Sequence, residues 1–204
     1  MVALSVAAMP THLPAETPVQ FSWAVLTDTD KGPRPIDFSS PATLPNGTTM
    51  QFYIEQKPGT FIYIYLIDST DNLEFLYPGE ADYYNSVAPV ERIFRIPADK
   101  DRFELTPPGG QEKLYILASS TRLIRLEKLT AVYVENPRDP VHKASVINEL
   151  KQIRRQHSKL AQSTETSVPV AGTIRSRGIP FDSFEATKVN AADFYSKILR
   201  INHE

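Results

Sequence analysis

The chain of 204 residues contains no cysteine, and this absence excludes several kinds of chemistry at once. Without thiols the protein forms no disulfide bond, no thiolate metal site and no cysteine nucleophile. The absence does not fix the compartment, since cysteine-free proteins occur on both sides of a membrane. Any functional chemistry must come from other residue types.

Long apolar runs are also missing. No stretch approaches the roughly 20 apolar residues that a membrane-spanning helix needs, so no membrane span is predicted. The first residues, Met1 to Ala8, are apolar but lack a basic start. Residues 1–18 are therefore interpreted as either an extended tail or the remnant of a secretory signal.

Catalytic signatures are absent as well. The chain has no His-Glu-x-x-His, no Gly-x-Ser-x-Gly and no glycine-rich phosphate loop. Its histidines, His12, His142, His157 and His203, are scattered. His157 falls on an apolar helical stripe, which favours a packed core histidine over a ligand or base. We expect no catalytic residue, no metal and no cofactor, and an enzyme is only the third hypothesis for function.

Charge is unevenly distributed along the chain although the net charge is −2. Residues 1–80 hold 3 basic and 9 acidic side chains, whereas residues 141–204 hold 10 basic and 6 acidic ones. A nucleic-acid-binding protein normally needs a strongly basic surface, so nucleic acid is not an expected partner. This charge asymmetry favours electrostatic attraction between the acidic N-terminal part and the basic C-terminal part, either within one chain or between copies arranged head to tail.

The segment 59–78 predicts an antiparallel hairpin. Phe61 to Ile67 are all aromatic or branched apolar residues, typical of a strand buried on both faces. Residues 68–72, Asp-Ser-Thr-Asp-Asn, favour a turn, and Leu73 to Tyr77 form the returning strand. Phe61, Tyr63 and Tyr65 share one face, which we expect to be core beneath a helix; an open face would instead form an aromatic platform.

The same turn gathers oxygen ligands, namely Asp68, Asp71, Asn72 and Glu74. Such a cluster raises the question of calcium, but no glycine supplies the sharp bend of a helix-loop-helix calcium loop. The sequence favours capping of the turn.

A second block begins at Ile96-Pro97, passes through Phe103-Glu104-Leu105 and ends in Gly109-Gly110-Gln111-Glu112 and a strand to Ser119. Together with the first block, it resembles the bacterial domain of unknown function four-three-eight-four over residues 48–120. Asn85 stands where that family often has an asparagine. The resemblance implies a β-sandwich-like module, often beside a kinase or protease domain or in envelope proteins, with no agreed catalytic residues.

Other elements follow from local patterns. Strands are predicted at 19–27, 48–56, 91–96, 168–175 and 184–189. Residues 28–47 are predicted to be a long surface loop and 163–167 a linker. The pattern does not decide the secondary structure of two segments. Residues 122–133 suit either a short helix or a strand, and residues 190–202 suit a helix or a strand, with the strand favoured.

The strongest helix signal begins at Asp139-Pro140, an N-cap followed by proline at the first helical position. We expect this helix to reach about residue 162. Its apolar stripe contains Val146, Leu150, Ile153, His157 and Leu160. The fold class is therefore a mainly antiparallel β-sandwich with one long amphipathic helix packed on it. The domain division is a tail at 1–18, a sandwich at 19–134, and a helix plus strands at 135–204 packing on the same domain.

The favoured contact surface is the segment 79–90. Tyr83 and Tyr84 stand in a polar loop beside Glu80 and Asp82, and exposed paired aromatics often anchor a partner. For the two tyrosines themselves, simple anchoring of the loop is the favoured interpretation and a binding role is the sharper alternative. Arg175 and Arg177, with Lys188 and Arg200, are a second candidate for a patch that binds an anion or a partner, although the sequence favours a solvated strand face.

These observations predict a non-enzymatic protein-binding or assembly module of a bacterial envelope or surface complex. The expected partner is another protein or a second copy of the chain. The expected location is the periplasm or cell surface, with the cytoplasm as the alternative. A glycan- or small-ligand-binding domain that uses loop aromatics is the runner-up hypothesis.

Overall fold

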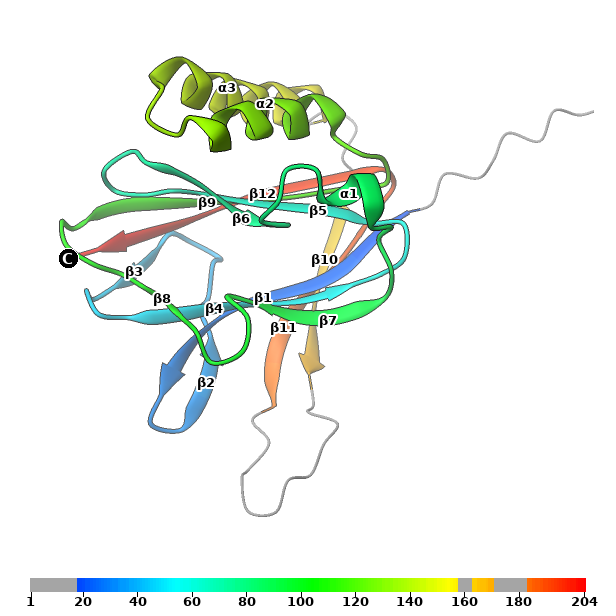
Figure 1. Ribbon diagram of the computed structural model, residues 1–204. Helices are drawn as coiled ribbons and strands as arrows, with labels where there is room; N and C mark the ends of the chain where they lie inside the picture. Colours follow the sequence, from blue (N-terminus) through cyan, green and yellow to red (C-terminus); the bar gives the residue numbers. More distant parts are fainter. Residues whose placement is uncertain (1–17, 158–162, 171–182) are drawn as a thin grey trace, which may run out of the picture.

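The computed structural model describes residues 18–157, 163–170 and 183–204. These residues form three layers (Figure 1): two β-sheets face each other, and two helices cover the outer face of one sheet. The prediction of a mainly β, sandwich-like fold is confirmed.

The first sheet has seven strands, with the hydrogen-bonded path β10-β11-β1-β4-β7 and with β2 and β8 added to β1 and β4. All of its pairings are antiparallel. Its strands are β1 (Val19–Thr29), β2 (Gly32–Pro35), β4 (Thr49–Gln56), β7 (Arg92–Ile96), β8 (Phe103–Glu104), β10 (Ser163–Val170) and β11 (Phe184–Ala191).

The second sheet has five strands in the order β3-β12-β9-β5-β6. Its strands are β3 (Ala42–Leu44), β5 (Phe61–Ile67), β6 (Leu73–Tyr77), β9 (Gly110–Ser119) and β12 (Phe194–His203). β3 and β12 are parallel, and the other pairs are antiparallel. The predicted hairpin is confirmed, since β5 and β6 pair antiparallel around residues 68–72.

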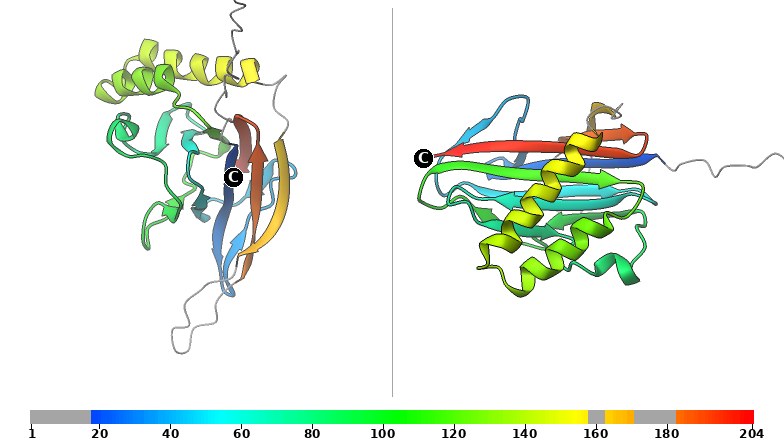
Figure 2. Two further views of the ribbon diagram at one scale, coloured as in Figure 1. Left: turned by 90° about the vertical axis from the view of Figure 1, so that its right-hand side faces the viewer. Right: turned by 90° about the horizontal axis from the view of Figure 1, so that it is seen from above.

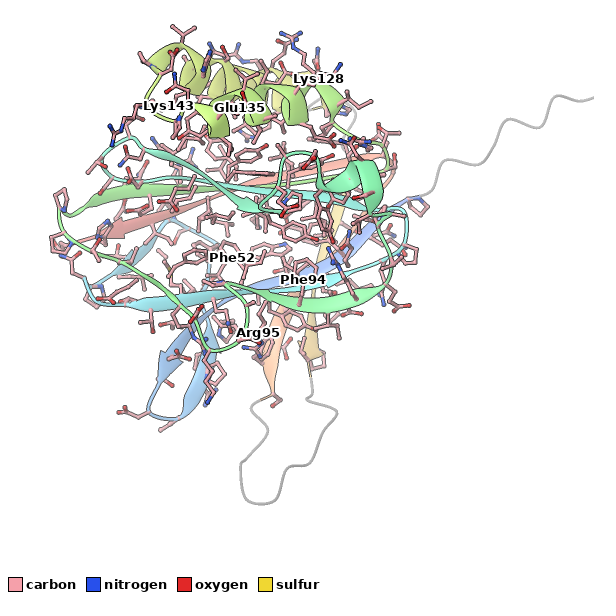
Figure 3. The ribbon with its side chains drawn as sticks, in the orientation of Figure 1. Phe52, Phe94, Arg95, Lys128, Glu135 and Lys143 are labelled. Carbon is pink, nitrogen blue, oxygen red and sulfur yellow. The ribbon has the colours of Figure 1, made fainter. Side chains whose placement is uncertain are left out.

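β5 is buried on both faces because the second sheet is the middle layer. Ile62 and Ile64 point into the core between the sheets, while Tyr63 and Tyr65 point toward the helices. The aromatic face is therefore core, as predicted. Figure 3 shows Phe52 and Phe94 between the two sheets and Arg95 on the outer side of the first sheet.

Two helices form the third layer, where the sequence predicted one. α3 (Pro140–His157) packs on the sheet through Val146, Leu150 and Ile153, as expected. Its predicted continuation, including Leu160, lies outside the described residues. The additional helix is α2 (Ile124–Glu135), which resolves the ambiguous segment 122–133. Figure 2 shows both helices crossing the strands obliquely.

Two loop predictions were wrong. Residues 28–47 contain β2 and β3, and β2 accommodates Pro33 and Pro35 because it pairs only with β1. Residues 163–167 belong to β10, which pairs with β11. These segments have little apolar character of their own, so only their neighbours reveal them as strands.

The C-terminal segment completes the middle layer. Residues 194–203 are a strand, as favoured, and this strand lies between β9 and β3. His203 is buried: its Nδ1 lies 2.7 Å from Asn46 Oδ1, and its Nε2 lies 3.1 Å from Glu112 Oε1. A Cβ at Gly109 would stand 2.7 Å from the His203 carbonyl oxygen, so this corner requires glycine.

Within the described residues, no helix has both the length and the apolar character needed to cross a membrane.

The tyrosine-rich core predicts alkaline unfolding. Burial raises the pKa of seven tyrosines: Tyr53, Tyr63, Tyr65, Tyr84, Tyr115, Tyr133 and Tyr195. Because the folded-state pKa lies above the unfolded value of about 10, stability is complete below that pH and lost above it. Each tyrosine that ionises only in the unfolded chain removes about 1.4 kcal/mol per pH unit. Most of the rise in absorbance at 295 nm should accompany the loss of circular dichroism above pH 10. Since the chain has nine tyrosines, ionisation of more than two of them before any loss of structure would contradict this.

Candidate functional site: the cleft between α1 and α2

The predicted contact segment, 79–90, contains a short helix, α1 (Tyr83–Ser86). Tyr84 is only 6% exposed, and its hydroxyl accepts a hydrogen bond from Ile62 N–H and donates one to Ile62 C=O, each at 3.0 Å. Ile62 lies before the β5–β6 pairing begins, so this hydroxyl satisfies backbone groups that lack a strand partner on that side. The expectation that both tyrosines are exposed is therefore wrong for Tyr84, which anchors the segment to β5.

Tyr83 belongs to a cluster centred on Arg92. Arg92 Nη1 donates to Tyr83 Oη at 2.8 Å, Nε donates to Gln56 Oε1 at 3.0 Å, and Nη2 donates to Tyr77 Oη. Its guanidinium also lies 4.7 Å from the centre of the Phe94 ring. Burial lowers the pKa of Arg92. The phenol of Tyr83 is thus engaged within the molecule, while Glu80 and Asp82 are exposed.

A polar network joins α1, α2 and β5. Tyr63 Oη donates to Glu127 Oε1 at 2.6 Å and accepts a bond from Leu123 N–H at 3.1 Å. Arg122 forms an ion pair with the buried Glu127 and donates to Asn85 Oδ1 at 2.8 Å. Burial, followed by the hydrogen bond to Glu127, raises the pKa of Tyr63. The network therefore holds α1 against the start of α2.

Beside this network lies a cleft of about 290 Å³, lined by Ala81, Asp82, Asn85, Arg122, Ile124, Glu127, Lys128 and Ala131. Ile124, at its rim, is 53% exposed. Among the described residues, neither Asp82 nor Lys128 takes part in an ion pair. Figure 3 shows Lys128 on the helical layer. The cleft thus presents the apolar side chain of Ile124 together with one carboxylate, that of Asp82, and one ammonium group, that of Lys128, neither of which is in an ion pair within the described part of the chain.

The second predicted patch stays a prediction, because only part of it is described. Arg175 and Arg177 lie outside the described residues. Of their expected neighbours, Lys188 is on β11 in the first sheet and Arg200 is on β12 in the second.

The acidic turn after β5 is a capped turn, as predicted. The Asp68 carboxylate accepts hydrogen bonds from the backbone and side chains of Thr70 and Asn72. Burial raises the pKa of Asp68, but these hydrogen bonds together outweigh it and lower the value. Across the described residues, no group of three or more His, Asp or Glu side chains is arranged to hold a metal ion.

His157 packs against a core residue as predicted, but it is not the fully buried, hydrogen-bonded histidine that the sequence favours, since its Nδ1 has no hydrogen-bond partner among the described residues. Its ring stacks on Phe194 with centroids 4.2 Å apart, and its side chain is 30% exposed. Its Nδ1 lies 3.9 Å from Asp193 Oδ2. The contact explains why a histidine occupies the apolar stripe.

Outside the segment 79–90, the sequence does not indicate five lining residues, namely Arg122, Ile124, Glu127, Lys128 and Ala131. The last four lie on α2, whose pattern does not distinguish helix from strand, and Arg122 lies just before it. The only local signal was the step from Leu123 to Leu126 and Leu129, which suits a helix. Nothing in the sequence links Glu127 to Tyr63, because the two are 64 positions apart.

Comparison with known families gives one match: residues 43–122 match the family described as Domain of unknown function (DUF4384). The match confirms the resemblance at 48–120. The matched segment contributes Ala81, Asp82, Asn85 and Arg122 to the cleft, whereas α2 lies beyond it. Searches of curated proteins and of solved structures found no match.

Proposed function

We propose that this protein is a non-enzymatic module that binds a protein partner, with the cleft between α1 and α2 as its contact surface. The observation that supports this most directly is the exposed Ile124 at the rim of a cleft whose walls are held by the Tyr63–Glu127–Arg122–Asn85 network. Binding hot spots commonly consist of an apolar side chain surrounded by polar residues, and binding costs less when those residues are already held in place.

The partner should present an apolar side chain with a basic group beside it. Glu80 and Asp82 are both exposed on the α1 side and supply the acidic rim. The basic C-terminal third of a second copy meets this description, as does a basic surface of another protein. In this proposal the protein works within a bacterial envelope or surface complex. That location stays a prediction from the family resemblance.

The runner-up hypothesis, a glycan-binding loop with paired aromatics, is less well supported. Such a platform requires exposed ring faces. Tyr84 is buried against Phe61 and Tyr63, and Tyr83 contacts Arg92. Neither ring is presented as a free stacking surface.

Substitution of Ile124 by Glu, and separately of Asp82 by Lys, tests the proposal. Each variant should weaken binding of the native partner, or self-association, by about 30-fold, the effect of one hot-spot side chain. Melting temperatures should stay within about 2 °C of the wild type, because both sites are exposed. Affinity would be measured by calorimetry with the partner recovered from the native organism, and self-association by sedimentation.

Val141→Glu is the matched control. Val141 is 68% exposed and lies near the start of α3. That end of the helical layer is the one away from α1 (Figure 1). Binding should be unchanged in this variant. If Ile124→Glu and Asp82→Lys bind and assemble like the wild type, the cleft is not the contact surface.

A further inference from the structure

A second cavity, of about 290 Å³, opens between the two sheets at the opposite end of the sandwich from α1. Its mouth is formed by the turn after β5, at residues 68–70, and by the segment 103–108 that leads into β9. The predicted contact surface plays no part in it, so the cavity is independent of the proposed function.

The interior of this cavity is apolar. Both sheets contribute to its walls, which include Met50, Phe52, Leu66, Phe103, Leu114 and Ile201. Protein interiors normally leave few voids larger than a water molecule. An engineered apolar cavity of about 150 Å³ in another protein holds benzene, so this one has room for a ring with a short side chain.

The mouth is acidic. Four carboxylates line the cavity, those of Asp68, Glu74, Glu104 and Glu112, and none of its lining residues is Lys, Arg or His. Glu112 is buried, and its Oε1 accepts a hydrogen bond from Ser69 N–H at 3.3 Å. Burial, with the charges of Asp68 and Glu112, raises the pKa of Glu74. Asp68 and Glu112 therefore repel Glu74, and a bound cation would relieve this repulsion. Glu112 Oε1 also lies 3.1 Å from His203 Nε2, which is not part of the lining.

The arrangement favours an organic cation over a metal ion. Metal binding needs several carboxylates converging on one point, and in the described part of the chain no such group exists. Separated carboxylates above an apolar floor instead match a ligand with a charged head and an apolar body. We propose that this cavity binds a small amphiphilic amine, with its ammonium group among the mouth carboxylates and its apolar group between the sheets.

The test is titration of the full chain with 2-phenylethylamine, a cation at neutral pH, followed by methyl NMR. The expected result is saturable binding with shifts at Leu66, Leu114 and Ile201. The same titration uses 2-phenylethanol, which is neutral and of similar shape, and 3-phenylpropanoate, which is an anion. The amine should bind at least about tenfold more tightly than the alcohol, the effect of hydrogen bonds to charged groups, and the anion should not bind.

Two variants assign the binding to this cavity. Glu74→Gln, an exposed change, should weaken amine binding about threefold to fivefold, while the matched change Glu80→Gln on the other end should leave it unaltered. Leu76→Trp should fill the cavity and abolish binding; if it does not fold, the Glu74→Gln result decides alone. Equal affinity for the alcohol, shifts away from the cavity, no amine binding at millimolar concentration, or Ca²⁺ producing the same shifts would each overturn the proposal.

Discussion

Leu150→Asp should prevent stable folding, because it places a carboxylate in the buried layer between α3 and the second sheet. Leu150 is fully buried in a cluster with Tyr63, Tyr65 and Leu126. Losing a core leucine lowers the free energy of unfolding by about 2–5 kcal/mol, and an unpaired buried charge adds several more. Since domains of this size are stable by about 5–15 kcal/mol, the variant should be largely unfolded.

Leu150→Ala should leave the protein folded, so that the contribution of Leu150 to the free energy of unfolding can be measured at equilibrium. It should lower the free energy of unfolding by about 3 kcal/mol, read from the midpoint of urea denaturation followed by circular dichroism. The control is Lys151→Ala, an exposed neighbour on the same helix, for which we expect less than about 0.5 kcal/mol. If Leu150→Asp melts like the wild type, α3 does not stabilise the sandwich and is free for another role.

Arg122→Met should have the second largest effect. Glu127 is 6% exposed, and Arg122 is the cation paired with it. Removing one partner of a buried ion pair leaves an uncompensated charge and can lower the free energy of unfolding by about 3–5 kcal/mol. Because Tyr63 still donates a hydrogen bond to Glu127, we expect about 2–3 kcal/mol here. The same change removes the bond to Asn85 and should loosen α1.

Two further variants distinguish the effect of breaking the Arg122–Glu127 ion pair from the effect of removing a positive charge in general. Lys128→Met removes a positive charge from the same helix surface and should change stability by less than about 0.5 kcal/mol. Arg122→Met combined with Glu127→Gln removes the buried charge altogether and should recover part of the loss. Urea midpoints of the wild type, Arg122→Met, Glu127→Gln and the double variant form a double-mutant cycle, which gives the coupling energy of the pair directly. A loss for Arg122→Met no larger than that for Lys128→Met would mean that the network does not hold the cleft together.

The candidate site was only partly predictable from the sequence. The tyrosines of the segment 79–90 predict a contact surface, yet Tyr84 is an internal anchor, and Ala81, Asp82 and Asn85 line the cleft. The polar character of the loop suggested exposure. A phenol hydroxyl can satisfy an unpaired strand edge, however, and only the position of β5 shows that such an edge is present.

The sequence by itself determined those elements whose residue pattern is local. The uniform apolar run at 61–67, the turn-forming residues at 68–72 and the Asp139-Pro140 start each specify their structure without help from distant residues. The tertiary structure decided the rest. β2 and β3 are strands because β1 and β12 offer backbone partners, and α2 is a helix because Leu126, Thr130 and Tyr133 together find a covered face. The cleft and the cavity arise where distant segments meet, and side-chain burial there depends on neighbours that no local pattern records.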